Sequence, residues 1–343
     1  MELRTTFNIT PSPEKITYDV PVMFIGSCFA TSIGRQFEAG HLPVMINPSG
    51  TVYNPVSVIN TLDTILEAKE YTEKDLYDFN GTWLSFEHYT DFSSENRQLV
   101  LEKINKRSAE AGKFLSGAGF LFITFGTARV YRWKADGRIV SNCHKIPAAQ
   151  FTHELLDVDD IEALWTSQLD KLHMNYPELK IVFTISPVRH WKDGPHGNQL
   201  SKATLLLAVE KLLEHPSHPG YFPAYELVMD DLRDYRFYAD DMLHPSDAAV
   251  DYIWNAFSGC YFDKNTLDTW REVEKITKAV SHRIQSGSNE SIRAFAENIL
   301  KKIDMLCAKR PSIDLTAERE YFLNLKNNRE IPGQAPSSLL SPH

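Results

Sequence analysis

Five short apolar segments constrain the fold of this chain more than any other feature of its sequence. Each is almost continuously apolar, and amphipathic segments separate most of them. Strands of this kind are buried on both faces, as in a parallel sheet that helices cover on each side. The pattern therefore predicts an α/β fold built on a parallel sheet. The five segments are residues 22–26, 42–46, 119–126, 180–186 and 226–230.

Residues 130–142 and 71–93 interrupt this alternation. The first segment predicts a β-hairpin that turns at Asp136-Gly137 and projects from the end of the third strand. The second segment contains aromatic residues with weak periodicity, and we expect a long structured loop there. Its aromatic side chains fit either a small satellite core beneath the loop or a surface that stacks on a sugar ring.

Beyond Tyr261 the apolar residues recur at helical spacing. Two such runs, at 273–284 and 292–306, predict a pair of helices, and Gly287 with its serine neighbours separates them. The last residues predict a flexible tail. The expected organisation is a main domain over residues 1–265, a helical extension over 266–310 and an extended or flexible tail over 311–343.

Composition narrows the functional classes. The formal net charge of -9 argues against a general binder of nucleic acid or anionic membranes. The four cysteines form no CxxC pair, which argues against a zinc ribbon and a disulfide scaffold and fits reduced thiols. The first residues lack the apolar core of a signal peptide, and no run approaches the roughly 20 apolar residues of a membrane span. We expect a cytoplasmic protein without cofactors, and its oligomeric state stays open.

The end of the first predicted strand carries two adjacent nucleophilic side chains. Ser27 and Cys28 follow Gly26, and a helix-like pattern begins directly after them. Sites in open α/β sheets form at the carboxyl ends of the strands. The amides at the start of a helix favour a thiolate and can hold an oxyanion. These residues are therefore candidates for a nucleophile and its oxyanion site.

Asp241 and His244 follow the fifth predicted strand at a spacing typical of a catalytic pair. The Asp-x-x-His spacing lets the carboxylate fold back onto the imidazole Nδ1 within one turn. The carboxylate then fixes the tautomer and leaves Nε2 free to act as a base. The same residues also fit a bland interpretation, in which His244 is an ordinary loop histidine, Ser27 caps a helix and Cys28 is buried core.

These motifs resemble those of a known family. The sequence FIGSCFA at residues 24–30 resembles the GSCFA family, which is similar to the SGNH (GDSL-type) hydrolases and acyltransferases. The resemblance spans residues 15–265 and includes SPVRH at 186–190 and DMLHPS at 241–246. It implies a three-layer α/β/α, flavodoxin-like fold with a five-stranded parallel sheet. It also implies a nucleophile at the end of the first strand and a late Asp-x-x-His pair.

The chain departs from the pattern of the SGNH hydrolases at the nucleophile and at the oxyanion hole. In register with Gly-Asp-Ser, the nucleophile position falls on Cys28, whereas a shift of one residue would make it Ser27. The family's oxyanion-hole asparagine is missing after Gly126, where the block Gly-x-Asn-Asp reads Gly-Thr-Ala-Arg. Gly50 resembles the glycine of the second block, which donates its amide. Replacement donors left open are Asn47, Asn54 and Asn142.

The resemblance implies an esterase or O-acyltransferase. His244 would take the proton from Cys28 or Ser27, and the nucleophile would attack an ester or thioester carbonyl. Water would then hydrolyse the acyl-enzyme, or a sugar hydroxyl would accept the acyl group. An acylated carbohydrate or a related small ester is the expected substrate by analogy. The alternative is a catalytically weak or inactive module that binds a glycan or a protein partner.

Further residues are candidates for the same cleft. Arg189 and His190 follow the fourth strand, where Arg189 fits a carboxylate or phosphate contact or an ion pair within the protein. His144 and His88 could reach the cleft, or serve as hydrogen-bonded structural histidines. Together with Cys28 and His244 they offer nitrogen and sulfur ligands for zinc, but no ligand spacing supports a metal, and we expect none.

Overall fold

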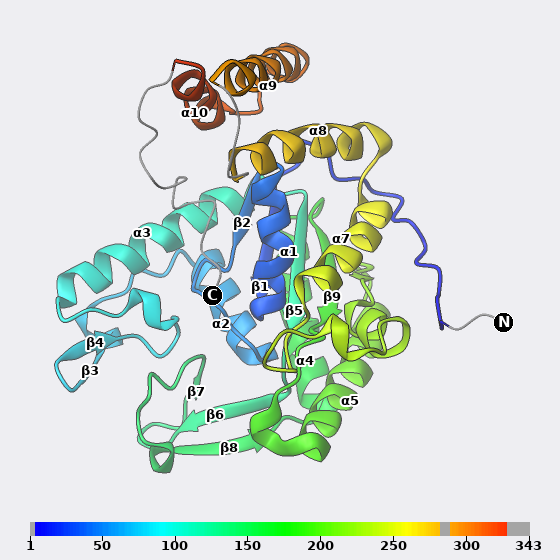
Figure 1. Cartoon of the computed structure of the whole chain (residues 1–343). Helices are drawn as coiled ribbons and strands as arrows, with labels where there is room; N and C mark the ends of the chain where they lie inside the picture. The colour runs from blue at the N-terminus through cyan, green and yellow to red at the C-terminus, as the bar shows by residue number, and fades with distance from the viewer. Residues whose placement is uncertain (1–3, 282–288, 328–343) are drawn as a thin grey trace. The chain divides into compact units, whose positions relative to one another are not determined.

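A five-stranded parallel sheet organises the main part of the chain in the computed structural model, which describes residues 4–281 and 289–327 (Figure 1). The strand order is β10-β9-β5-β1-β2, and each neighbouring pair is parallel. The order reverses between β1 and β5, the point at which ligand sites form in such sheets. The strands are β1 (Val22–Gly26), β2 (Val44–Ile46), β5 (Phe120–Phe125), β9 (Lys180–Ile185) and β10 (Gly220–Tyr221).

Four of the five predicted strands are confirmed, and the prediction for residues 226–230 is wrong. Those residues lie in α6 (Ala224–Glu226) and in a π-helical turn at Leu227–Asp231. A short apolar run cannot be assigned to a strand or a buried helix by periodicity alone. The fifth strand is instead β10, whose two residues carry no apolar pattern.

Helices cover both faces of this sheet (Figure 1). On one face the rings of Phe24 and Phe122 stack at 5.0 Å, and Phe257 of α7 packs 5.0 Å from Phe122. On the other face Ile25 and Ile123 join a buried cluster with side chains of α2, α4 and α5. The predicted three-layer α/β/α class is confirmed. The helices are α1 (Cys28–Ala39), α2 (Pro55–Leu66), α3 (Arg97–Leu115), α4 (Val158–Asn175), α5 (Gly194–Leu213) and α7 (Asp247–Tyr261).

Two antiparallel additions extend from the sheet. The predicted hairpin is confirmed, and a third strand that the sequence did not predict joins it in the order β7-β6-β8. The expected loop at 71–93 contains a short hairpin of its own, β3-β4. The rings of Phe86 and Trp133 pack at 5.0 Å in a small buried cluster that joins the two additions. The strands are β3 (Tyr77–Phe79), β4 (Thr82–Leu84), β6 (Arg129–Trp133), β7 (Ile139–Val140) and β8 (Phe151–Leu155).

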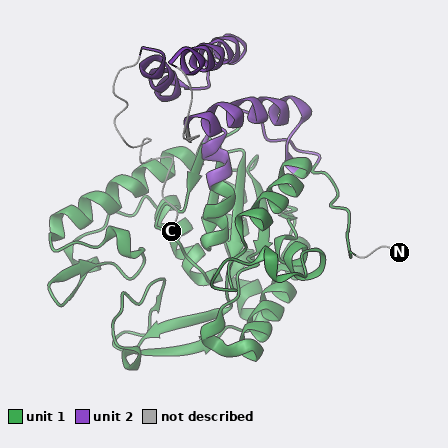
Figure 2. Cartoon of the chain, viewed as in Figure 1, with its two compact units in different colours: residues 1–12, 20–34, 44–260 green, residues 13–19, 35–43, 261–343 purple. Residues whose placement is uncertain are grey.

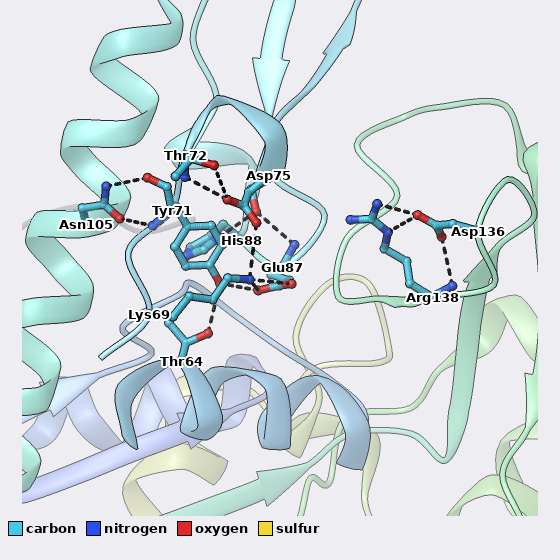
Figure 3. Close-up of polar contacts among 11 residues, drawn as sticks. Thr64, Lys69, Tyr71, Thr72, Asp75, Glu87, His88, Asn105, Asp136 and Arg138 are labelled. Carbon is cyan, nitrogen blue, oxygen red and sulfur yellow. Dashed lines mark hydrogen bonds and ion pairs between the residues drawn. The ribbon is translucent and has the colours of Figure 1, made fainter. Parts of the chain in front are cut away.

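A polar network fastens the β3-β4 addition to the neighbouring helices (Figure 3). The Tyr71 hydroxyl contacts Thr64 of α2 and donates to Glu87, which also pairs with Lys69 at 3.3 Å. Asn105 of α3 bonds to both the amide and the carbonyl of Tyr71, at 2.8 and 2.9 Å. Burial is the main cause that raises the pKa of Tyr71. The network is satisfied within itself, so we interpret it as structural.

The chain from residue 261 onward, with 13–19 and 35–43, forms a second compact unit (Figure 2). Within it the Trp270 indole donates to the Gln36 carbonyl at 2.9 Å, and the Phe295 and Phe322 rings pack at 6.1 Å. A Cβ at Gly40 would lie 2.0 Å from Trp270, so only glycine fits there. The helices are α8 (Lys264–Ser281), α9 (Asn289–Lys309) and α10 (Thr316–Lys326).

Helix α10 corrects the expectation of an extended or flexible tail over 311–343. Phe322 and Leu325 of this helix are buried, but two core residues in so short a segment give little periodic signal. The expected tail at 332–343 and the break at Gly287 lie outside the described residues.

Candidate active site

The turn between β1 and α1 places Cys28 at the carboxyl edge of the sheet. Gly26 has φ +144°, and a Cβ there would lie 2.1 Å from the Thr124 carbonyl oxygen of β5. Only glycine therefore allows the turn. The Gly26 amide donates to Asn47 Oδ1 at 2.8 Å, and the Ser27 amide donates to Thr124 at 3.1 Å. These bonds fix the direction in which α1 begins.

Cys28 is the first residue of α1 and is partly exposed. The first amides of a helix have no acceptor inside it, so the Cys28 amide points out of the helix start as a donor. The Cys28 side chain lies close enough to His244 to raise the pKa of that histidine. Two loops that lie more than two hundred residues apart in the sequence thus lie near each other, although the strand expected before Asp241 is helical.

Asp241 holds His244 in the predicted way. Its Oδ2 lies 2.5 Å from His244 Nδ1, and its Oδ1 accepts from the amides of Leu243 and His244 at 2.8 and 2.9 Å. These backbone bonds lower the pKa of Asp241 to about 2. The interaction of the ring with Cys28 and then the hydrogen bond that it donates to Asp241 raise the pKa of His244 to about 9, against an opposing effect of burial. With Nδ1 taken by Asp241, Nε2 is the ring atom left for the thiol.

Ser27 occupies a different environment from its neighbour. It is 1% exposed, and its Oγ accepts from the Phe29 amide at 3.3 Å, which caps the start of α1. Of the two nucleophiles that the sequence left open, the geometry brings Cys28 and not Ser27 to His244 among the described contacts.

Two further groups of this site were not among the expected catalytic residues. Lys202 of α5 is 1% exposed, and its Nζ donates to the carbonyls of Gly126 and Ser186 at 2.7 and 2.6 Å. Burial lowers the pKa of Lys202 to about 7. The sequence gives one sign of this position: Lys202 stands at helical spacing from Leu205 and Val209, and all three are buried in α5. Lys202 thus ties the ends of β5 and β9 together beneath the site.

His190 lies on the same floor. Its Nε2 would be 3.1 Å from a Cβ at Gly126, and its ring meets the ring of Tyr53 edge-on at 5.6 Å. Burial, with the charges of Lys202 and His244, lowers the pKa of His190 to about 4, so the ring is neutral at neutral pH. The sequence indicated only that His190 follows the fourth strand.

Two family models match the chain. One, described as the GSCFA family, matches residues 21–257, and the other, described as the C-terminal domain of GSCFA domain proteins, matches residues 273–327. The chain belongs to the GSCFA family. The first match ends within α7, and the second covers α9 and α10 with the second half of α8.

Solved structures resemble this GSCFA protein only distantly. One from Parabacteroides merdae ATCC 43184, described as a GDSL-like lipase, has 13% identity and a TM-score of 0.34, covering 74% of this chain and 98% of that chain. Another is the acetyl xylan esterase Est2A from the rumen bacterium Butyrivibrio proteoclasticus, with 11% identity and a TM-score of 0.36, covering 71% and 66%. No curated protein matches the chain. We therefore base no functional assignment on these two similarities.

Several residues predicted to bind an oxyanion or substrate have other partners in this GSCFA protein. The Gly50 amide donates to the Asn47 carbonyl at 2.8 Å, and the Gly126 amide donates to the Tyr53 carbonyl at 2.7 Å. Asn54 caps α2 through Ser57, accepting from its amide and donating to its hydroxyl at 2.9 Å. The prediction of oxyanion donors at these positions is therefore corrected, because local turns and caps use the groups.

Asn142 and His144 belong to the cluster around Phe86 and not to the cysteine site. Asn142 donates to the Thr90 hydroxyl at 3.2 Å and accepts from the His144 amide at 2.9 Å. His144 Nε2 contacts the Ser85 carbonyl at 2.8 Å, and burial lowers the pKa of this histidine. The expectation that they line the cleft is corrected in favour of the structural alternative.

Arg189, by contrast, borders the loop of the catalytic candidates. Its amide approaches the Leu243 carbonyl at 3.5 Å, next to His244, and its guanidinium lies 5.6 Å above the Trp191 ring.

No three His, Cys, Asp or Glu side chains converge on a possible metal position in residues 4–281 and 289–327. Within the same residues, no helix combines the length and apolar character that crossing a membrane requires.

Proposed function

We propose that this protein is an SGNH-like esterase or O-acyltransferase in which Cys28 is the nucleophile. The observation that carries the proposal is the contact of His244 Nδ1 with Asp241 at 2.5 Å, together with the effect of the nearby Cys28 side chain on the pKa of the same ring. A nucleophile, a base and a group that orients the base are the parts that covalent acyl transfer needs.

The steps of the reaction follow from this geometry. His244 holds the proton of the Cys28–His244 pair as an imidazolium, and the sulfur of Cys28 bonds to the carbonyl carbon of an ester. The tetrahedral oxyanion lies near the free amide at the start of α1. The ester C–O bond then breaks, and His244 gives its proton to the leaving alcohol. Water or a sugar hydroxyl attacks the resulting thioester, passes its proton to His244 and releases Cys28.

A second oxyanion donor is needed because the family's asparagine is absent. We assign this role to His190, which is neutral at neutral pH and lies on the floor of the site beside Gly126. A neutral imidazole still carries one N–H group, which can donate a hydrogen bond to the developing oxyanion. We assign Lys202 the role of a positioning residue, because two carbonyls of the sheet edge accept from two of its three N–H groups.

The analogy with carbohydrate esters extends the proposal to a sugar as the alcohol part or the acyl acceptor. Trp191 is 52% exposed beside Arg189 and offers an aromatic face to a sugar ring.

Turnover of a panel of acetyl and longer acyl esters tests the proposal. Cys28→Ala and His244→Ala should each lower kcat/KM by at least about 10³-fold, because each removes a member of one catalytic unit. Ser27→Ala should keep most of the activity. Cys143→Ala is the matched control, since burial raises the pKa of that thiol to about 11 and it lies in the Phe86 cluster. Wild-type turnover that survives both Cys28→Ala and His244→Ala would overturn the assignment.

A further inference from the structure

Arg189 is a partly buried cation without a counter-ion. The side chain is half-buried, and its Nε is fully buried without a hydrogen-bond partner. No ion pair joins its guanidinium to any carboxylate among residues 4–281 and 289–327. Nearby Asp241 is held by His244, and Asp193 is shared by Arg129 and His153. A buried guanidinium N–H without a hydrogen-bond partner is costly to a fold, so the retention of Arg189 Nε in this position points to a ligand.

The place of Arg189 ties that ligand to the reaction. Its amide contacts the carbonyl of Leu243, the residue before His244. Its charge lowers the pKa of the Tyr225 and Tyr238 hydroxyls against the opposing effect of burial, so both hydroxyls lie within its electrostatic range. Arg189 therefore lies at the rim of the cysteine site, between the β9 edge and the His244 loop.

The chemistry of the ligand follows from the donor. A guanidinium offers a planar fork of N–H groups that matches the two oxygens of a carboxylate or phosphate. The chain as a whole carries a formal charge of -9, so it has no general attraction for anions. The N–H groups of the Arg189 guanidinium, which has no carboxylate partner among the described residues, are thus the feature that would select a negatively charged molecule.

We propose that Arg189 binds a carboxylate or phosphate group on the molecule whose acyl group reaches Cys28. That this molecule is a substrate rests on the proposed function, whereas the anion site itself does not depend on it. The negative group either belongs to the acyl part or to the alcohol part of the ester.

Alkylation of Cys28 tests the anion site without any turnover. Iodoacetate and iodoacetamide form the same S–C bond and release iodide, but only iodoacetate is charged. The rates are followed by mass spectrometry on the peptide that contains Cys28, in the full chain. Arg189→Met should lower the iodoacetate-to-iodoacetamide rate ratio by about tenfold, and Arg189→Lys by only about two- to threefold. Arg236→Met is the matched control, because Arg236 is exposed and pairs with Asp234 at 2.7 Å.

The iodoacetamide rate shows whether Arg189→Met keeps the fold of the site, since it should stay close to the wild-type rate. Should that variant not fold, the wild type still decides: inorganic phosphate should slow alkylation of Cys28 by iodoacetate more than by iodoacetamide. An unchanged rate ratio in a folded Arg189→Met, or no such selective protection by phosphate, would overturn the proposal.

Two ester pairs then locate the negative group. 4-Nitrophenyl hydrogen succinate against 4-nitrophenyl acetate tests a charge on the acyl side. 4-Acetoxybenzoate against 4-acetoxybenzamide tests a charge on the alcohol side. The preferred pair should lose its preference in Arg189→Met. Turnover with an unaffected alkylation ratio would refute the anion site alone, whereas a fallen ratio without turnover of any ester would refute the proposed function alone.

Discussion

At the scale of single residues, the protonation of His244 controls the proposed chemistry. The interactions with Cys28 and Asp241 raise its pKa to about 9, so the imidazolium persists well above neutral pH. That imidazolium supplies the proton for the leaving alcohol. Its protonation therefore links the geometry of the pair to a measurable pH profile.

We predict that kcat/KM for an acyl ester falls as the pH rises through about 9. The sign follows from the raised pKa, because the protonated form is present below that value and is lost above it. Asp241→Asn removes one cause of the raised pKa and should move this alkaline limb to lower pH. The profile is measured from pH 5 to 10 with both proteins, and identical alkaline limbs would contradict the role of Asp241.

The neutral state of His190 leads to a second prediction. His190→Ala should lower kcat by about 10²–10³-fold with a much smaller change in KM, because an oxyanion donor acts mainly in the transition state. His190→Asn should recover part of kcat, since an amide N–H can donate in the same place. Steady-state kinetics of the three proteins decide this, and equal losses in kcat for both variants would point to a purely structural role.

At the scale of elements, the β1-α1 turn depends on a glycine. Gly26→Ala would force a Cβ to within 2.1 Å of the Thr124 carbonyl at a φ of +144°. We expect a loss of unfolding free energy of at least about 3 kcal/mol. Gly137→Ala is the control, because its φ is +79° and nothing lies within 4 Å of its Cβ position. There the loss should stay near about 1 kcal/mol. Urea unfolding measures both, and equal losses would refute the close-approach argument.

The elements also show what the sequence could predict. Strands β1, β5 and β9 were readable because long apolar runs between amphipathic segments have few other structures available. Strand β10 was not, since two residues at Gly220–Tyr221 pair with β9 through backbone bonds alone. The sequence around Asn54 does not distinguish a helix cap from a ligand contact, and the structure shows that Asn54 caps α2.

At the scale of the whole molecule, the meeting of two distant loops was predictable and its surroundings were not. Parallel strands align their carboxyl ends, so motifs after the first and last strands converge on one edge. The floor of Lys202 and His190 comes from tertiary packing of α5 and the β9 edge, which no local pattern encodes. The net charge of -9 gives no sign that Lys202 and Arg189 lie near this site, because composition does not record position.

The central claim is that Cys28 accepts an acyl group from an ester with His244 as its base. Its most direct test is the intact mass of the full chain, quenched in acid during turnover of a slowly hydrolysed acyl ester. We expect one added acyl group, mapped to Cys28 and removed by hydroxylamine, in the wild type and not in His244→Ala. An acyl group on another residue, or turnover without any acylated Cys28 in the quenched protein, would contradict it.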